Sequence, residues 1–89
     1  MLVRVRFLGS LRAIAGVKEL EVKLPERSDI SDLLHLLSLD HPELCAVLTD
    51  PLLGNLIFVG GVEVSNIEGV GTQLIDDSEV VIVPVTHGG

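Results

Sequence analysis

Residues 79–89 read EVVIVPVTHGG, and residues 80–85 are apolar at every position. A short run rich in β-branched residues is typical of a strand at the centre of a sheet. The acidic turn signal at residues 76–78, DDS, precedes this run. We therefore expect the last strand to occupy residues 79–85 and to lie at the centre of the sheet.

Two alternating segments near the start of the chain predict the partner strands. Residues 2–8 and 19–24 each alternate with a period of two, as half-buried strands do. The sequence between them contains two glycines and is expected to be a loop, which makes the pair an antiparallel hairpin. The side chains expected to face the core are Val3, Val5, Phe7, Leu20, Val22 and Leu24.

Two helices are expected after the hairpin. Residues 25–27 break the strand, and Ser28 is the expected N-cap of a helix of about three turns. Residues 43–49 predict a second, shorter helix after Pro42. The inward apolar side chains are expected to be Ile30, Leu33, Leu34 and Leu37 on the first helix, and Leu44, Val47 and Leu48 on the second.

The remaining chain predicts a strand at residues 56–59, a Gly60-Gly61 turn, a brief extension at 62–64 and a loop over 65–73. This order is typical of an α+β domain with a mixed sheet and helices on one face. Parallel pairing of the last strand with the first gives the β-grasp (ubiquitin-like) fold. We expect one main helix and a second short helix in it.

Length and composition limit both the organisation and the function. With 89 residues the chain has room for one domain, which we place at residues 1–85, followed by a flexible tail at 86–89. An aromatic content of 2% excludes base-stacking nucleic-acid platforms. A single cysteine excludes a disulfide framework and a cysteine-based zinc site.

Charge is distributed unevenly along the chain. All six Lys and Arg residues lie within residues 1–27, whereas residues 28–89 carry ten Asp and Glu residues and no Lys or Arg. Such an acidic chain repels nucleic acid and anionic membranes, so we expect neither as a partner, and it suits a basic protein partner. Taken alone, the acidic charge is equally consistent with a role only in keeping the protein soluble. No apolar run approaches the ~18 residues of a membrane span, and a cytoplasmic location is expected.

The sequence finishes on Gly88-Gly89. Activation of a C-terminal carboxylate requires the tail to enter a narrow active site, and glycine, lacking a Cβ, lets the backbone pass. Two glycines alone are also typical of an incidental end. The wider sequence is more informative, because several segments match one family.

The whole chain resembles the β-grasp sulfur carriers, above all the small subunit of molybdopterin synthase (MoaD-like). Residues 5–8 (VRFL), followed by Leu11-Arg12 and Gly16, resemble that family's first strand with its arginine and glycine. Residues 77–80 (DSEV) and 84–89 (PVTHGG) resemble its acidic turn, proline-bearing strand and tail. The chain departs from the family at Ala13, at the Val59-Gly60-Gly61 turn and at Ser78, and these departures blur which sulfur pathway it serves.

The resemblance implies a role for the terminal glycine. An E1-like adenylating enzyme would activate the Gly89 carboxylate with Mg-ATP, and a sulfur donor would then convert it to a thiocarboxylate. Gly88 and His87 would form the tail that enters the large subunit of molybdopterin synthase, where the sulfur passes to a pterin precursor. The chain would bind no cofactor or metal and would act as a co-substrate, without catalysis of its own.

A docking surface is expected on the sheet face opposite the helices. Parallel pairing of the first and last strands would place Leu8, Val81, Val83 and Val85 together on that face. Apolar residues on a face that is otherwise solvated indicate a partner, and the resemblance puts partner contacts at Leu8 and Val83. The alternative is that a central strand is apolar without any partner.

The remaining reactive side chains give less information about function. Cys45 is expected to be a buried small hydrophobe on the short helix, and His35, His41 and His87 lack metal-ligand spacing and are expected to be exposed. Three hypotheses therefore stand: a sulfur carrier for molybdenum or tungsten cofactor synthesis, a ubiquitin-related protein modifier or tRNA-thiolation carrier, and a non-catalytic β-grasp interaction module. A thiamine sulfur carrier is less favoured, since those chains are shorter and lack the second helix.

Overall fold

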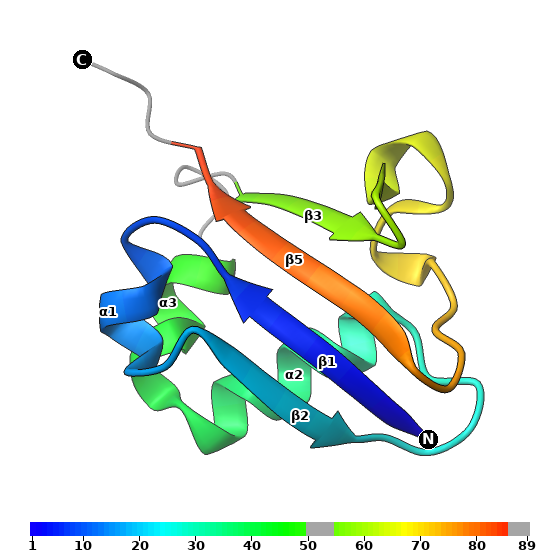
Figure 1. The fold of residues 1–89 in the computed structure, drawn as a ribbon, viewed down its shortest axis with the longest axis horizontal. Coiled ribbons are helices and arrows are strands. Elements are labelled where there is room, and N and C mark those ends of the chain that lie inside the picture. The colour runs from blue at the N-terminus through cyan, green and yellow to red at the C-terminus, as the bar shows by residue number, and fades with distance from the viewer. Residues whose placement is uncertain (50–54, 86–89) are drawn as a thin grey trace.

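The computed structural model describes residues 1–49 and 55–85 (Figure 1). Two short 3₁₀ turns, η1 (Val64–Asn66) and η2 (Gly69–Gly71), follow the fourth strand. The strands and α-helices, in chain order, are β1 (Leu2–Phe7), α1 (Leu11–Ala15), β2 (Glu19–Lys23), α2 (Ile30–Asp40), α3 (Pro42–Thr49), β3 (Asn55–Val59), β4 (Val62–Glu63) and β5 (Ser78–Pro84).

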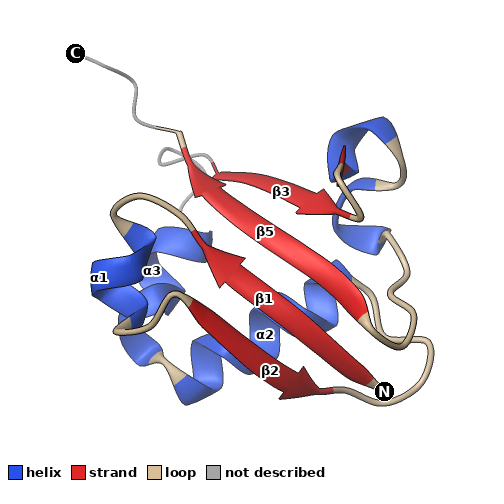
Figure 2. Cartoon of the chain, viewed as in Figure 1, coloured by secondary structure: helices blue, strands red, loops and turns tan. Residues whose placement is uncertain are grey.

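The strands form one mixed sheet in the order β2-β1-β5-β3-β4. β1 and β5 are parallel, and the other neighbouring pairs are antiparallel. Figure 2 shows α2 and α3 behind the sheet, with the opposite face of the sheet open to the viewer. The β-grasp prediction is confirmed, including the central place of the last strand.

Alternation along β1 and β5 explains why the sheet has one buried face. Phe7 on β1 lies opposite Ile82 on β5, and both are fully buried against the helices. Removal of such side chains from water supplies the main driving force for folding. The other fully buried aliphatic side chains include Val3, Val5, Val80, Leu11, Ile30, Leu33 and Leu44. The predicted inward faces of the hairpin and of α2 are therefore confirmed, with Leu20 and Leu34 partly buried against this core.

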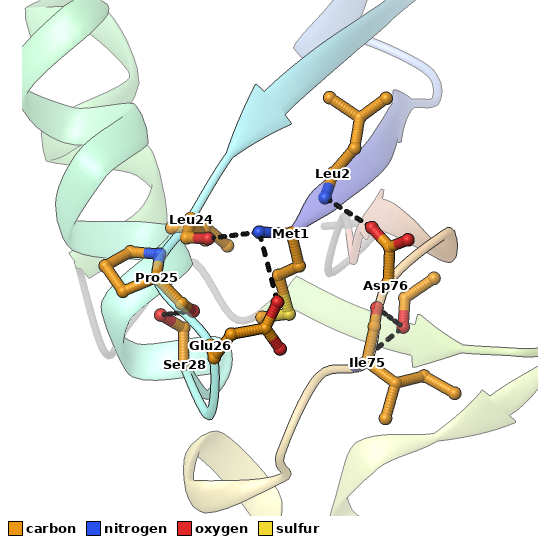
Figure 3. Close-up of polar contacts among 9 residues, drawn as sticks. Met1, Leu2, Leu24, Pro25, Glu26, Ser28, Ile75 and Asp76 are labelled. Atoms are coloured by element: carbon orange, nitrogen blue, oxygen red, sulfur yellow. Dashed lines mark hydrogen bonds and ion pairs between the residues drawn. The ribbon is translucent and has the colours of Figure 1, made fainter.

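α2 begins one residue later than expected. Asp29, not Ser28, is the N-cap, and its side chain accepts a hydrogen bond from the Asp32 N–H at 2.9 Å while Asp32 accepts one from the Asp29 N–H at 2.9 Å. Ser28 is buried and its hydroxyl donates instead to the Pro25 carbonyl at 2.7 Å (Figure 3). Ser28 therefore stabilises the turn before the helix, and Asp29 caps the helix.

Replacement of Asp29 by Ala should lower the free energy of unfolding by about 1 kcal/mol, because the first turn of α2 loses an N-cap acceptor. Urea denaturation followed by circular dichroism would measure this change. Asp40→Ala is the matched control, since Asp40 is an exposed acid at the other end of the same helix. An unchanged midpoint for Asp29→Ala would contradict the capping assignment.

One helix differs from the sequence-based expectation, and the other expected helix is present. Residues 11–15 form the short helix α1 inside the expected loop, and this helix buries Leu11 and Ala15 before it ends at Gly16 with φ +79°. Five residues are too few to reveal a helical period, which is why the pattern did not indicate it. α3 is present as predicted, with Leu44 buried and Leu48 partly buried; the side chain of Val47 lies outside the described part.

The predicted burial of Cys45 and the predicted exposure of His41 are both wrong. Cys45 is exposed, because Leu44 takes the inward position of α3 and the next residue is rotated by about 100° around the helix. His41 is half-buried as the C-cap of α2, where its N–H donates to the Leu37 carbonyl at 2.8 Å. His35 is exposed as predicted, and His87 lies outside the described residues.

The turn before β5 is tied to the start of β1 (Figure 3). The Asp76 carboxylate accepts from the Leu2 N–H at 2.8 Å, and the Asp77 N–H donates to the Leu2 carbonyl at 2.8 Å. The Met1 amine donates to the Leu24 carbonyl at 2.7 Å. This end of the sheet is therefore held by hydrogen bonds from the Asp76 side chain and from backbone groups of three segments. Within residues 1–49 and 55–85, no helix is long and apolar enough to cross a membrane.

Candidate functional site

Val81 and Val83 lie on the open face of the sheet. Their neighbours Val80 and Ile82 are fully buried, so alternation along β5 turns the two valines away from the helices, where both are half-buried. Leu8, also half-buried, follows β1, and its N–H donates to the Ile82 carbonyl at 3.1 Å, which sets it beside Val83. Val85 is half-buried and is the last described residue.

β3 adds two residues that the sequence did not reveal. Its antiparallel register pairs Leu56 with Val83 and Phe58 with Val81. Leu56 is 39% exposed and Phe58 is half-buried, whereas Ile57 between them is buried. Residues 56–59 are all apolar, so only the register with β5 decides which of them face outward. We call the outward set Leu8, Leu56, Phe58, Val81 and Val83 the apolar patch.

The other half of the open face is charged. Arg4 lies 3.5 Å from Asp77, and Arg6 lies 3.8 Å from Glu79, in both cases between a guanidinium nitrogen and a carboxylate oxygen. Glu19 and Glu21 on β2 lie opposite the two arginines. The side chains of these pairs are 41–80% exposed, and the pairs therefore contribute little to stability. The face is thus divided between the charged groups of β1, β2 and the start of β5, and the apolar patch on β3, the rest of β5 and Leu8.

Glu63 borders the apolar patch on the side of β4. The register places it opposite Phe58, and its carboxylate accepts hydrogen bonds from the Ser65 side chain and the Ser65 N–H. The side-chain hydrogen bond, followed by the backbone one, lowers the pKa of Glu63. The carboxylate therefore stays charged at neutral pH and gives the patch an acidic rim.

The turn after β1 packs against the end of β5. Gly9 adopts φ +56°, and a Cβ at this position would lie 3.1 Å from Pro84 Cγ. Arg12 on α1 donates from Nε to the Phe7 carbonyl at 3.0 Å and so fixes the same corner. Residues 86–89 follow directly on this corner in the sequence.

Replacement of Gly9 by Ala should lower the free energy of unfolding by about 1–2 kcal/mol from backbone strain alone, with a further loss from the close approach to Pro84. Gly16→Ala is the matched control, because Gly16 also has a positive φ but a methyl group there would have nothing within 4 Å. Thermal unfolding of both variants measures the difference. A Gly9→Ala protein no less stable than Gly16→Ala would contradict the packing role.

The three tail residues predicted from the sequence, His87, Gly88 and Gly89, lie outside the described residues. The predicted surface residues Leu8, Val81 and Val83 are brought together on one face, and Val85 follows them at the end of β5. Among the described residues, no group of three His, Cys, Asp or Glu side chains could hold a metal ion. The arrangement suits docking of a protein partner.

Comparison with known structures gives close matches over the full length. The small archaeal modifier protein 1 (SAMP1) from Methanosarcina acetivorans is 28% identical, with a TM-score of 0.83 over 99% of this chain and 96% of that one. A putative molybdopterin converting factor, subunit 1, from Pyrococcus furiosus is 26% identical, with a TM-score of 0.82 over 97% and 99%.

A third structure, the BexX/CysO complex of Amycolatopsis orientalis, contains a chain that is 21% identical, with a TM-score of 0.80 over 98% of this chain and 99% of that one. This likeness shows the fold alone. A search of curated proteins gave no match. The family model described as "ThiS family" matches residues 5–89. The chain therefore belongs to the ThiS family of β-grasp sulfur carriers.

Proposed function

We propose that this sulfur carrier serves molybdopterin synthesis in the cytoplasm, with Gly89 as its reactive residue. An E1-like enzyme uses Mg-ATP to adenylate the Gly89 carboxylate, and a sulfur donor converts the adenylate to a thiocarboxylate. The large subunit of molybdopterin synthase then receives the tail and passes the sulfur to a pterin precursor. The chain binds no cofactor or metal and acts as a co-substrate.

The position of the apolar patch carries this proposal. The patch lies at the end of β5 that leads directly into residues 86–89. A partner seated on Leu8, Phe58 and Val83 would therefore have its own surface next to Val85, within a few residues of Gly89. Exposed apolar residues that are rimmed by charged ones are typical of protein interfaces.

The chemistry explains the need for a tail without side chains. In the first step a Gly89 carboxylate oxygen attacks the α-phosphate of ATP, and pyrophosphate leaves. In the second step a sulfur nucleophile attacks the carbonyl carbon, and AMP leaves. Both steps require the carbonyl to enter the partner's active site, and glycines at positions 88 and 89 allow close backbone approach.

Relatives support both the family role and the pathway. Carriers of the ThiS and MoaD type work with E1-like activating enzymes and with partner enzymes. The similarity to a putative molybdopterin converting factor subunit favours the pterin pathway. The ten acids of residues 28–89 favour a basic groove on the partner, and such an association weakens as salt is added.

A second candidate function is protein modification or tRNA thiolation, in which the activated Gly89 serves another acceptor. The similarity to small archaeal modifier protein 1 favours it. A third candidate is an interaction module in which the glycines have no role. No contact among the described residues favours it over the other two. The three differ in what becomes of Gly89.

Incubation with an E1-like enzyme, ATP and sulfide tests the carrier function. Intact-mass measurement should show replacement of one oxygen by sulfur, and only when ATP is present. In cells, deletion of the gene should starve molybdenum or tungsten enzymes of cofactor, while a tagged copy should form few covalent adducts. Normal cofactor levels with many Gly89-linked proteins would favour the modifier, and no ATP-dependent change of mass would contradict both.

A further inference from the structure

We propose that β2 pairs with β2 of a second copy of the chain, antiparallel and centred on Val22, so that two sheets join into one. The inference goes beyond the proposed function, because it concerns the edge of the sheet opposite to β3 and β4. It requires neither activation of Gly89 nor the apolar patch. It follows from the backbone groups and the charges that β2 turns outward.

β2 is an outer strand of the sheet (Figure 1), and within residues 1–49 and 55–85 only β1 pairs with it. Just before β2 the Lys18 carbonyl accepts from the Phe7 N–H at 2.9 Å, and just after it the Leu24 N–H donates to the Met1 carbonyl at 2.9 Å. Hydrogen-bonded pairs alternate along an antiparallel ladder, so the even-numbered residues of β2 bond to β1. The odd-numbered residues turn their N–H and C=O groups to the free edge. They are Glu19, Glu21 and Lys23.

The side chains of the same residues extend a series of alternating charges across the open face. Asp77 lies 3.5 Å from Arg4, and Arg4 lies opposite Glu21 in the register of β1 with β2. The next group in this series, beyond the edge, would be a cation. Lys23 is the cation of β2, and it lies opposite the apolar Leu2. Among the described residues, no ion pair joins Lys23 to a carboxylate.

One register satisfies the backbone and the charges together. A two-fold axis through Val22 places Glu21 of each copy opposite Lys23 of the other, in an isologous contact. Both residues turn their backbone groups outward, so each of the two Glu–Lys pairs also exchanges two backbone hydrogen bonds. Directly opposed unlike charges stabilise a strand pair, and like charges destabilise it. An axis one residue earlier would set the two Glu21 carboxylates against each other.

The charge distribution of the chain permits this contact. The net charge is −7, but residues 1–27, which include β1 and β2, hold all six Lys and Arg residues and only three acids. The joined edges are therefore the least acidic part of the molecule, and repulsion between the distant acids is screened beyond about 8 Å at physiological ionic strength. The contact is two short strands, which places the dimer in the weak class of interfaces. β3 and β5 take no part in it, so the apolar patch remains open in both copies.

The test uses the full chain and two charge reversals. In a homodimer, Glu21→Lys would oppose lysine to lysine, and Lys23→Glu would oppose acid to acid. In an equimolar mixture of the two variants, each opposed pair is again one lysine and one glutamate. Glu19→Lys is the matched control, because the proposed register places Glu19 opposite Pro25. Sedimentation velocity at concentrations up to about a millimolar, as a weak interface requires, measures association, and melting temperatures verify that each variant is folded.

Wild type and Glu19→Lys should show the same concentration-dependent dimer. Each reversal alone should raise the Kd of dimerisation by at least about tenfold, because two attractive pairs become repulsive, and the mixture should associate about as well as wild type. A wild-type chain that stays monomeric, a Glu19→Lys chain that is weakened as much as Glu21→Lys, or a mixture that associates no better than its components would overturn the inference. Sulfur loading is measured on the monomer and is judged separately from each of these results.

Discussion

Deletion of Gly89 should abolish ATP-dependent sulfur loading while leaving the free energy of unfolding unchanged. The terminal carboxylate would then belong to Gly88, one residue too short to reach the catalytic position of the activating enzyme. Stability should not respond, because the buried core of the described residues lies between Val3 and Ile82. Intact mass after incubation with enzyme, ATP and sulfide measures loading, and urea denaturation measures stability.

Gly89→Ala provides the matched control for this deletion. It keeps the length and the carboxylate and adds one methyl group to the residue that must pass through a narrow channel. We expect loading to be reduced by the substitution and lost in the deletion. If the chain without Gly89 still accepts sulfur, or still supports cofactor synthesis, the carrier mechanism is contradicted and an interaction module is favoured.

Val83→Glu should weaken partner binding by about 2 kcal/mol or more, roughly a 30-fold rise in Kd. The substitution puts a charge at the centre of the apolar patch, between Leu8 and Leu56, where the partner would have to desolvate it. Leu8→Glu should act in the same direction. Titration calorimetry against the activating enzyme or the large synthase subunit measures the change.

Val62→Glu is the control for this prediction, since Val62 is an exposed strand valine on β4 outside the patch. It should leave Kd nearly unchanged. Val83→Glu should lower the free energy of unfolding much less than it lowers the free energy of binding, because Val83 is only half-buried in the monomer. Thermal unfolding of the variant measures the change in stability. A loss of stability as large as the loss of binding would mean that Val83 belongs to the core.

The strand framework was predictable because its signals are long and regular. Residues 2–8 alternate with the two-residue period of a strand, the β-branched run at residues 80–85 is typical of a central strand, and burial of one face fixes the pairing. α1 was missed because five residues give no period. The exposure of Cys45 was missed because a helix as short as α3 offers two apolar faces, and only packing decides that Leu44 points inward.

The candidate site was only half predictable for a similar reason. Leu8, Val81 and Val83 follow from the parallel pairing of two strands that the sequence indicates. Leu56 and Phe58 depend on the register between β3 and β5, a contact between segments more than twenty residues apart. Continuous apolar residues in β3 fit either register. The role of Gly89 came from resemblance to a family and stays a prediction, since residues 86–89 lie outside the described part.

The parallel pairing of β1 with β5 also governs how the protein is made. β5, which completes the middle of the sheet, is synthesised after the other strands, and each β1 residue from Val3 to Phe7 pairs with a β5 residue 75 positions later in the sequence. The core cannot close before that pairing forms. Closing so long a loop is slow compared with local helix formation. A ribosome-bound or truncated chain that lacks β5 therefore lacks the docking face as well, and only a fully folded carrier presents both the face and Gly89 to its activating enzyme.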